Sequence, residues 1–303
     1  MDPVRYARIL VATDLSPASE EAIRQADRIA RAHKAELRVV HVFPNHIGAH
    51  PLFSGIHKAT SANVFELREG VKTALDAKVA ALTGRKKGEV GVSFEEGIPA
   101  ARIVAAAESW PADLVVVASH GRSGWRRMVL GGVAERVVRL APCPVLVARR
   151  SPEKGAILAA TDFSDPSIPA VAAAASFATR FGRPLAVLHS TEAYRLGTSV
   201  VAIGPVPEAI MLPVESLDQL RKDAGIELDK VLAQCGTPGE KIVSDGPPGG
   251  AILEAADSLP AELIVLGTIG RTGLSRLLMG NVAESVVSGA PCSVLVVRLN
   301  RTG

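Results

Sequence analysis

The chain has 303 residues, which is long enough for two domains of ordinary size. Hydrophobic residues make up 48% of it and aromatic residues only 4%, as is typical of an Ala-, Val- and Leu-rich core of helices on a sheet. The net charge of +3 does not indicate a nucleic-acid partner, because such partners usually require basic residues concentrated on one face.

Cysteine usage favours a reducing compartment. The three cysteines, at positions 143, 235 and 292, are odd in number and too widely spaced for a disulfide framework, so we expect a cytoplasmic protein. Charged residues and then a predicted strand follow the first methionine at once, which is not the plan of a signal peptide. The longest uncharged apolar runs are short or interrupted by proline, and no membrane span is expected.

The chain begins with a strand, a helix and a second strand. Residues 8–13 form a short apolar run, as expected for a central parallel strand that is buried on both faces. Ser16 is suited to be an N-cap and Pro17 to be the first helical residue, so we expect a helix from there to about His33. A second strand is expected over residues 37–42.

A long loop over residues 43–57 follows the second strand. Its three histidines, His46, His50 and His57, have no counterparts in the second half of the chain, so the loop is interpreted as a lid and not as a metal site. The other elements expected in the first half are a helix at 61–82, a strand at 90–94, a helix after Gly97, a strand at 114–118, a helix at 133–140 and a strand at 145–148.

The second half repeats this order. Gly121 and Gly270, and likewise Gly131 and Gly280, are separated by 149 residues, a period that corresponds to a whole domain. Strands are expected at 156–161, 184–189, 240–244, 263–266 and 293–298, with helices at 166–181, at 214–234, from 251 and from the glycine at 280. The prediction is two tandem flavodoxin-like or Rossmann-like α/β domains, residues 1–150 and 151–303, each with a five-stranded parallel sheet flanked by helices.

Two features of each half point to a phosphate-bearing ligand. Asp14 and Asp162 end the first strands, where open α/β sheets bind ligands; each either caps the next helix or accepts hydrogen bonds from a ligand. The fourth strand of each half runs into glycines, a basic loop of nine residues and another glycine that begins a helix. Small residues allow a close backbone approach, and N–H groups at a helix start attract anions.

These residues resemble the universal stress protein family in its tandem two-domain form. The family signature is Gly-x-x-Gly, nine residues and then Gly-Ser or Gly-Thr after the fourth strand, with an Asp at the end of the first strand. The resemblance covers nearly the whole chain. It implies binding of ATP, with or without Mg²⁺, and edge-to-edge pairing of the two last strands, which would make the chain an intramolecular pseudo-dimer.

The resemblance implies nucleotide-binding roles for matching positions in both halves. In the second half these positions are Ala160, Thr161, Asp162, Ser190, Leu266, Gly267, Ile269, Gly270, Arg271, Gly280, Asn281 and Val282. In the first half they are Ala12, Thr13, Asp14, Val42, Val117, Ala118, His120, Gly121, Arg122, Gly131, Gly132 and Val133. Ala118 replaces a family glycine, and Gly132 and Asn281 replace the hydroxyl residue, so the second domain is expected to be the better site.

The predicted function is a cytoplasmic, ATP-binding stress-response protein that signals through its conformation or through protein partners, including self-association. No Walker lysine, Ser-His-Asp set or pair of acids recurs in both halves, so nothing beyond slow ATP hydrolysis is indicated. The alternative is a scaffold, or a carrier of a small apolar ligand, which the three replacements and the apolar loop at 200–211 favour. An adenylating enzyme would need a Ser-Gly-Gly-x-Asp-Ser loop, where the sequence has Ala12-Thr-Asp-Leu-Ser16.

Overall fold

The computed structural model describes residues 4–43, 61–86, 88–121, 130–152, 154–192, 200–201, 208–209, 214–268 and 279–298. The chain divides into two compact units. One unit is Arg5–Arg149, and the other begins at Arg150 and includes Val4. Within the described ranges, no helix has the length and hydropathy needed to cross a bilayer.

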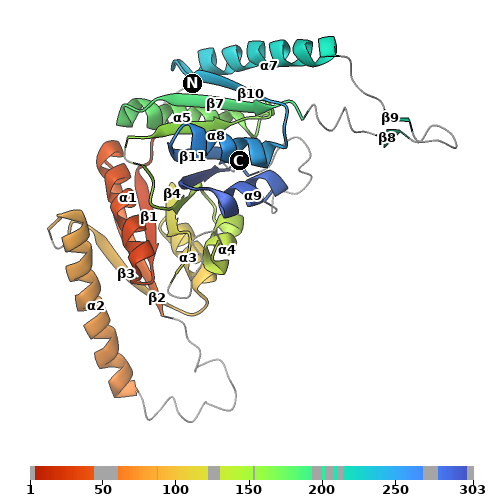
Figure 1. Cartoon of the computed structure of the whole chain (residues 1–303). Helices are drawn as coiled ribbons and strands as arrows, with labels where there is room; N and C mark the ends of the chain where they lie inside the picture. Colours follow the sequence, from red (N-terminus) through yellow and green to blue (C-terminus); the bar gives the residue numbers. More distant parts are fainter. Residues whose placement is uncertain are drawn as a thin grey trace. The chain divides into compact units, whose positions relative to one another are not determined.

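The first unit is a parallel sheet covered by helices on both faces (Figure 1). The strands, in the order β5-β4-β1-β2-β3 across this sheet, are β1 (Arg8–Thr13), β2 (Glu36–Phe43), β3 (Gly91–Glu96), β4 (Leu114–Ala118) and β5 (Val145–Ala148). Helices α1 (Pro17–His33) and α2 (Ser61–Thr83) pack together on one face, and α3 (Pro99–Ser109) and α4 (Gly132–Leu140) pack on the other.

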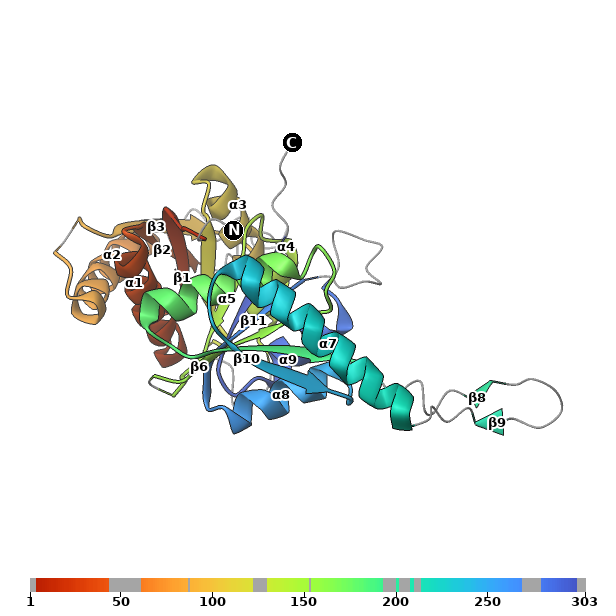
Figure 2. The ribbon, with the colours of Figure 1, turned by 90° about the horizontal axis from the view of Figure 1, so that it is seen from above.

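The second unit has the same topology. Its strands, in the order β10-β7-β6-β11-β12, are β6 (Ala156–Ala160), β7 (Leu185–Ser190), β10 (Glu240–Ser244), β11 (Ala261–Gly267) and β12 (Ser293–Val297). Its helices are α5 (Ile168–Phe181), α7 (Val214–Cys235), α8 (Pro248–Ser258) and α9 (Asn281–Gly289). Figure 2 shows α7 and α8 on opposite sides of β10. The predicted class, two tandem α/β domains with parallel sheets, is confirmed.

The sequence explains where these elements begin. Residues 9–13 of β1 are all buried, as a strand covered on both faces requires. The Ser16 hydroxyl accepts a hydrogen bond from the Ser19 N–H at 3.3 Å, and Pro17 is the first residue of α1. The predicted cap and helix start of α1 are therefore confirmed.

Several predicted boundaries differ from the structure by one to three residues; β3, for example, ends at Glu96 and not at 94, and β11 begins at Ala261 and not at 263. Helix α5 begins at Ile168 and not at 166, because the preceding residues form a turn in which the Ser167 N–H donates to Ser164 O at 2.9 Å. Helix α8 begins at Pro248, three residues early, since proline suits the first turn of a helix. The predicted loop after β7 contains two short antiparallel strands, β8 (Val200–Val201) and β9 (Glu208–Ala209), and β-branched valines favour that conformation.

The same hydrogen-bonded turn follows the first strand of each unit. Thr13 Oγ1 lies 2.9 Å from Ser19 Oγ and accepts from the Leu15 N–H at 3.1 Å. Thr161 Oγ1 lies 2.8 Å from Ser167 Oγ and accepts from the Phe163 N–H at 3.0 Å. Leu15 and Phe163 have φ values of 66° and 63°, which non-glycine residues seldom adopt. These threonines therefore stabilise a strained turn that holds Asp14 or Asp162 in place.

We predict that Thr161→Val destabilises the second domain. Valine keeps the shape of the side chain but leaves the Phe163 N–H and the Ser167 hydroxyl without their shared partner, which costs about 1–3 kcal/mol in the free energy of unfolding. Urea denaturation of the full chain measures this loss. Thr179→Val, on the exposed part of α5, is the matched control and should change stability by less than about 0.5 kcal/mol. Equal losses in the two variants would contradict the assigned role.

Candidate functional site

The strand order places a crossover point at the centre of each sheet. In the first unit β1 and β4 are neighbours, yet the chain continues from them into helices on opposite faces, α1 and α4. In the second unit β6 and β11 are related in the same way, through α5 and α9. Parallel α/β sheets bind ligands beyond the carboxyl ends of such strands. Asp14 and Ser119 lie at this point in the first unit, and Asp162 and Thr268 in the second.

The helices that begin at this edge, α4 and α9, each start after a glycine. The N-caps of α4 and α9 are Gly131 and Gly280, and no side chain caps either helix. The Gly131 N–H donates to Ser119 O at 2.7 Å and the Gly280 N–H to Thr268 O at 2.8 Å, so these two predicted site amides are already engaged. The next three amides of each helix, at 132–134 and 281–283, have no acceptor among the described residues. Such groups attract anions.

The aspartate at the end of each first strand holds the turn that follows it. Asp14 Oδ1 accepts from the Ser16 N–H at 3.0 Å, and Asp162 Oδ1 accepts from the Ser164 N–H at 3.1 Å. Each aspartate thus stabilises the turn before the helix and does not cap the helix itself, since Ser16 is the N-cap of α1 and Ser167 that of α5. A Cβ atom on Gly121 would lie 2.5 Å from Asp14 Oδ2, so the backbone after β4 approaches this carboxylate more closely than any other residue type allows.

Two buried histidines were missed by the sequence analysis. His41 Nδ1 lies 2.8 Å from Thr13 O, and His189 Nδ1 lies 2.9 Å from Thr161 O. Each imidazole ties the second strand to the end of the first. In the second unit the Phe163 ring also stacks on His189, with 4.1 Å between ring centroids. The two histidines are separated by 148 residues, as are Asp14 and Asp162. This repeat spacing could have identified them in the sequence.

The structure divides the predicted site residues into three sets. Those with buried side chains, which offer a ligand only their backbone, are Ala12, Thr13, Val42, Val117, Thr161 and Leu266. Those that lie at strand ends or helix starts with partly or largely exposed side chains are Asp14, Ala118, His120, Gly121, Gly131, Gly132, Val133, Ala160, Asp162, Ser190, Gly267, Gly280, Asn281 and Val282. Those outside the described residues are Arg122, Ile269, Gly270 and Arg271.

Several polar groups in these sets already have protein partners. The Ser190 hydroxyl donates to Gly246 O, and His120 Nδ1 lies 2.9 Å from Ser119 Oγ. Among the described residues, no three His, Cys, Asp or Glu side chains gather in a way that could hold a metal ion, and the loop histidines at 46, 50 and 57 lie outside this part of the chain.

Ion pairs flank the site in each unit. Lys78 Nζ lies 2.7 Å from Glu20 Oε1, and its hydrogen bond holds the pKa of Glu20 below its ordinary value. In the second unit Arg221 hydrogen-bonds Asp245 and lowers the pKa of that carboxyl group in the same way. Both carboxylates are therefore ionised and paired at neutral pH, so they repel an arriving anion less than unpaired acids would.

The topology and the repeated site define a tandem, doubly wound α/β protein. The sequence model of the universal stress protein family matches residues 5–149 and again residues 155–298, so the chain belongs to this family. A universal stress protein of Mycolicibacterium smegmatis is 27% identical over 305 residues, which cover 96% of each chain.

A solved structure supports this fold over nearly the whole chain. The crystal structure of a universal stress protein from Archaeoglobus fulgidus covers 96% of this chain and 98% of its own, with a TM-score of 0.64 and 21% identity. A universal stress protein crystallised in complex with cAMP covers 48% of this chain and 98% of its own, with a TM-score of 0.32 and 24% identity.

We predict opposite effects for two glycine substitutions at the first site. Gly121→Ala places a methyl group against Asp14 Oδ2 and should destabilise the domain by about 1–3 kcal/mol. Gly132→Ala meets no atom within 4 Å and lies in the first turn of α4, so it should be neutral or stabilising by up to about 1 kcal/mol. Thermal and urea unfolding check both values, and a stable Gly121→Ala variant would contradict the close approach to Asp14.

Proposed function

We propose that the protein binds a nucleotide, with ATP as the favoured ligand, and acts in stress-response signalling. The observation that supports this most is that the three amides at the start of α4, and again those at the start of α9, have no acceptor within the described part of the chain. A phosphate group supplies both the charge and the acceptor oxygens that these amides lack. Asp14 and Asp162, at the adjacent strand ends, are the groups proposed to accept hydrogen bonds from the ribose.

The described residues leave room for phosphates at these helix starts. At Gly132 an added Cβ atom would meet nothing within 4 Å, so the entrance to α4 is open. At the matching position of α9 the exposed Asn281 brings an amide group that can donate to a phosphate oxygen. ATP in cells usually carries Mg²⁺, which would be held chiefly through the phosphate oxygens.

We propose the second domain as the stronger site. It has Gly267 where the first domain has Ala118, and it has Asn281 where the first has only Gly132. At the carboxyl edge of its sheet the second domain has the aromatic residue Phe163, where the first domain has Leu15. Nucleobases stack well on aromatic rings. Each difference adds either space or a favourable contact for a nucleotide.

We infer a binding protein and not an efficient enzyme. Asp14 and Asp162 each use one carboxylate oxygen to hold a turn, which suits a positioning role better than activation of water. Signalling would then follow from the bound state and from the partners it recruits. A cytoplasmic location fits the cysteine usage, in which Cys143 and Cys292 are buried free thiols.

We predict that Gly280→Asp separates helix stability from nucleotide binding. Its backbone, at φ −67° and ψ 154°, suits an N-cap residue, and a Cβ there meets only Thr268 O at 3.4 Å. The aspartate should cap the free amides of α9, keeping or raising stability by about 1 kcal/mol, while it repels phosphates. Calorimetric titration with Mg·ATP, and separately with cAMP, should show at least about a tenfold loss of affinity, or about 1.4 kcal/mol.

Two control variants complete this experiment. Gly280→Ala adds a methyl group but neither a charge nor a cap, so it should retain most of the binding. Gly131→Asp tests the first domain in the same way and should have the smaller effect if the second site is stronger. Unchanged Mg·ATP affinity in both aspartate variants would exclude the helix starts as phosphate sites.

The alternative function is a scaffold, or a carrier of a small apolar ligand. It is favoured by the replacements at Ala118, Gly132 and Asn281, each of which departs from the family signature. Native mass spectrometry of freshly purified protein should reveal co-purified nucleotide by its mass and its absorbance near 260 nm if the nucleotide proposal holds. A bound lipid in place of a nucleotide, together with no calorimetric response to Mg·ATP, would favour the carrier.

A further inference from the structure

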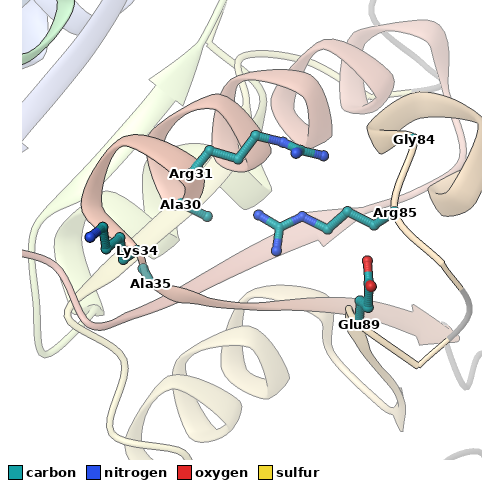
Figure 3. Close-up of a pocket in the computed structure, with 7 residues that line it drawn as sticks. All are labelled: Ala30, Arg31, Lys34, Ala35, Gly84, Arg85 and Glu89. Carbon is teal, nitrogen blue, oxygen red and sulfur yellow. The ribbon is translucent and has the colours of Figure 1, made fainter.

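A recess of about 420 Å³ lies in the first domain (Figure 3). Its walls are the end of α1, the residue before β2 and the segment that follows α2. Because α1 runs antiparallel to the strands, its end lies at the amino edge of the sheet, the opposite edge from the candidate nucleotide site. The charged residues of the recess are Arg31, Lys34, Arg85 and Glu89.

A buried carboxylate holds two arginines in this recess. Asp27 is only 7% exposed, and its two oxygens accept from Arg31 Nε at 2.8 Å and from Arg85 Nε at 2.5 Å. Arg31 Nη2 also donates to Thr83 O at 2.7 Å. Arg31 Nη1 and both terminal nitrogens of Arg85 have no acceptor among the described residues. The guanidinium groups are thus fixed in position while donors remain available.

The recess carries excess positive charge. The three cations of the recess, Arg31, Lys34 and Arg85, outnumber the carboxylates of Asp27 and Glu89 by one. Glu89 is more than 4.0 Å from all three cations, and its Oε2 accepts from the Lys86 N–H at 3.0 Å. Figure 3 shows Arg31 and Arg85 extending from opposite walls, with Glu89 beside Arg85 and Lys34 at the other end.

Basic residues at the end of a helix often serve only to compensate its dipole. The equivalent helix of the second domain, α5, has its basic last-turn residue, Arg180, at a different position and still ends in the same way, so dipole compensation alone does not require Arg31. The Ala35 N–H donates to Ala30 O, and the Arg183 N–H donates to Ala178 O, both at 2.8 Å. The residues that match Asp27, Arg31, Lys34 and Arg85 are nevertheless uncharged: Ala175, Thr179, Gly182 and Thr237.

Lys34 supplies a separate argument. It is the C-cap of α1 and has φ 54°, a left-handed conformation that favours glycine, and the second domain has Gly182 there with φ 61°. The first domain therefore keeps a lysine where glycine would be less strained. Helix termination alone does not explain this choice, and Lys34 adds a positive charge at one end of the recess.

We propose that this recess binds the phosphate group of a small phosphorylated metabolite. Paired guanidinium groups match the geometry of phosphate oxygens, and arginines held by a carboxylate need little reorganisation to bind one. The volume lies in the range of small-molecule pockets and exceeds what inorganic phosphate alone would fill. This site is separate from the candidate nucleotide site and does not rest on the function proposed above.

The test is an NMR titration of the ¹⁵N-labelled full chain at constant ionic strength. The probes are glycerol 3-phosphate, inorganic phosphate and, as a neutral control, glycerol. Saturable shifts of the Arg31 and Arg85 Nε–Hε signals and of the Gly84 amide are expected with glycerol 3-phosphate, and weaker binding with inorganic phosphate. Equal affinity for the two anions would overturn the metabolite assignment, and shifts that never saturate would overturn the site.

Three variants make the result specific. Arg31→Gln keeps the Arg85–Asp27 pair and should weaken binding about tenfold, while Lys34→Gly should weaken it severalfold without lowering the unfolding midpoint. Lys72→Gln removes the same charge from an exposed position on α2, about 18 Å along the helix from Gly84, and should bind like the parent. Equal affinity of all three variants, or shifts confined to the amides at 132–134 and 281–283, would overturn the proposal.

Discussion

The first turn of an α-helix always leaves backbone N–H groups without intrahelical acceptors, and this constraint organises the functional edge of both domains. Among the helices whose first turns the structure describes, α1 has a capping side chain, whereas α3, α5 and α8 have none, and α4 and α9 begin after glycines that have no side chain to offer. The bonds from Gly131 to Ser119 and from Gly280 to Thr268 fix where each helix starts relative to the neighbouring strand. Amides at the start of a helix favour an acceptor, and the helix dipole favours an anion.

The two domains share a backbone plan but differ in how they use charge. The turn after the first strand, with its threonine, serine and histidine, is the same in both. At the amino edge they diverge: Asp113 accepts from the Ala7 and Arg8 amides at 2.8 Å, whereas the matching Glu262 is 4% exposed and pairs with Arg183. The two domains thus share the residues that form the turn after the first strand and differ in the charged residues at the amino edge of the sheet.

Much of this arrangement could be predicted from the sequence because it depends on local signals. The apolar runs predicted the strands, and Ser16 and Pro17 predicted the start of α1. The repeat predicted two domains. The hydrogen bonds that join distant residues were not predictable in this way. His41 meets Thr13 across 28 positions, and Arg85 meets Asp27 across 58, so neither pairing follows from spacing alone. The nucleotide roles of Gly270 and Arg271 remain predictions, since both lie outside the described residues.

The bond between His41 and Thr13 determines the tautomer of the neutral imidazole. A carbonyl oxygen can only accept, so Nδ1 must carry hydrogen, and a neutral His41 then presents a lone pair at Nε2. The turn that carries Asp14 therefore fixes which of the two ring nitrogens of His41 bears the hydrogen.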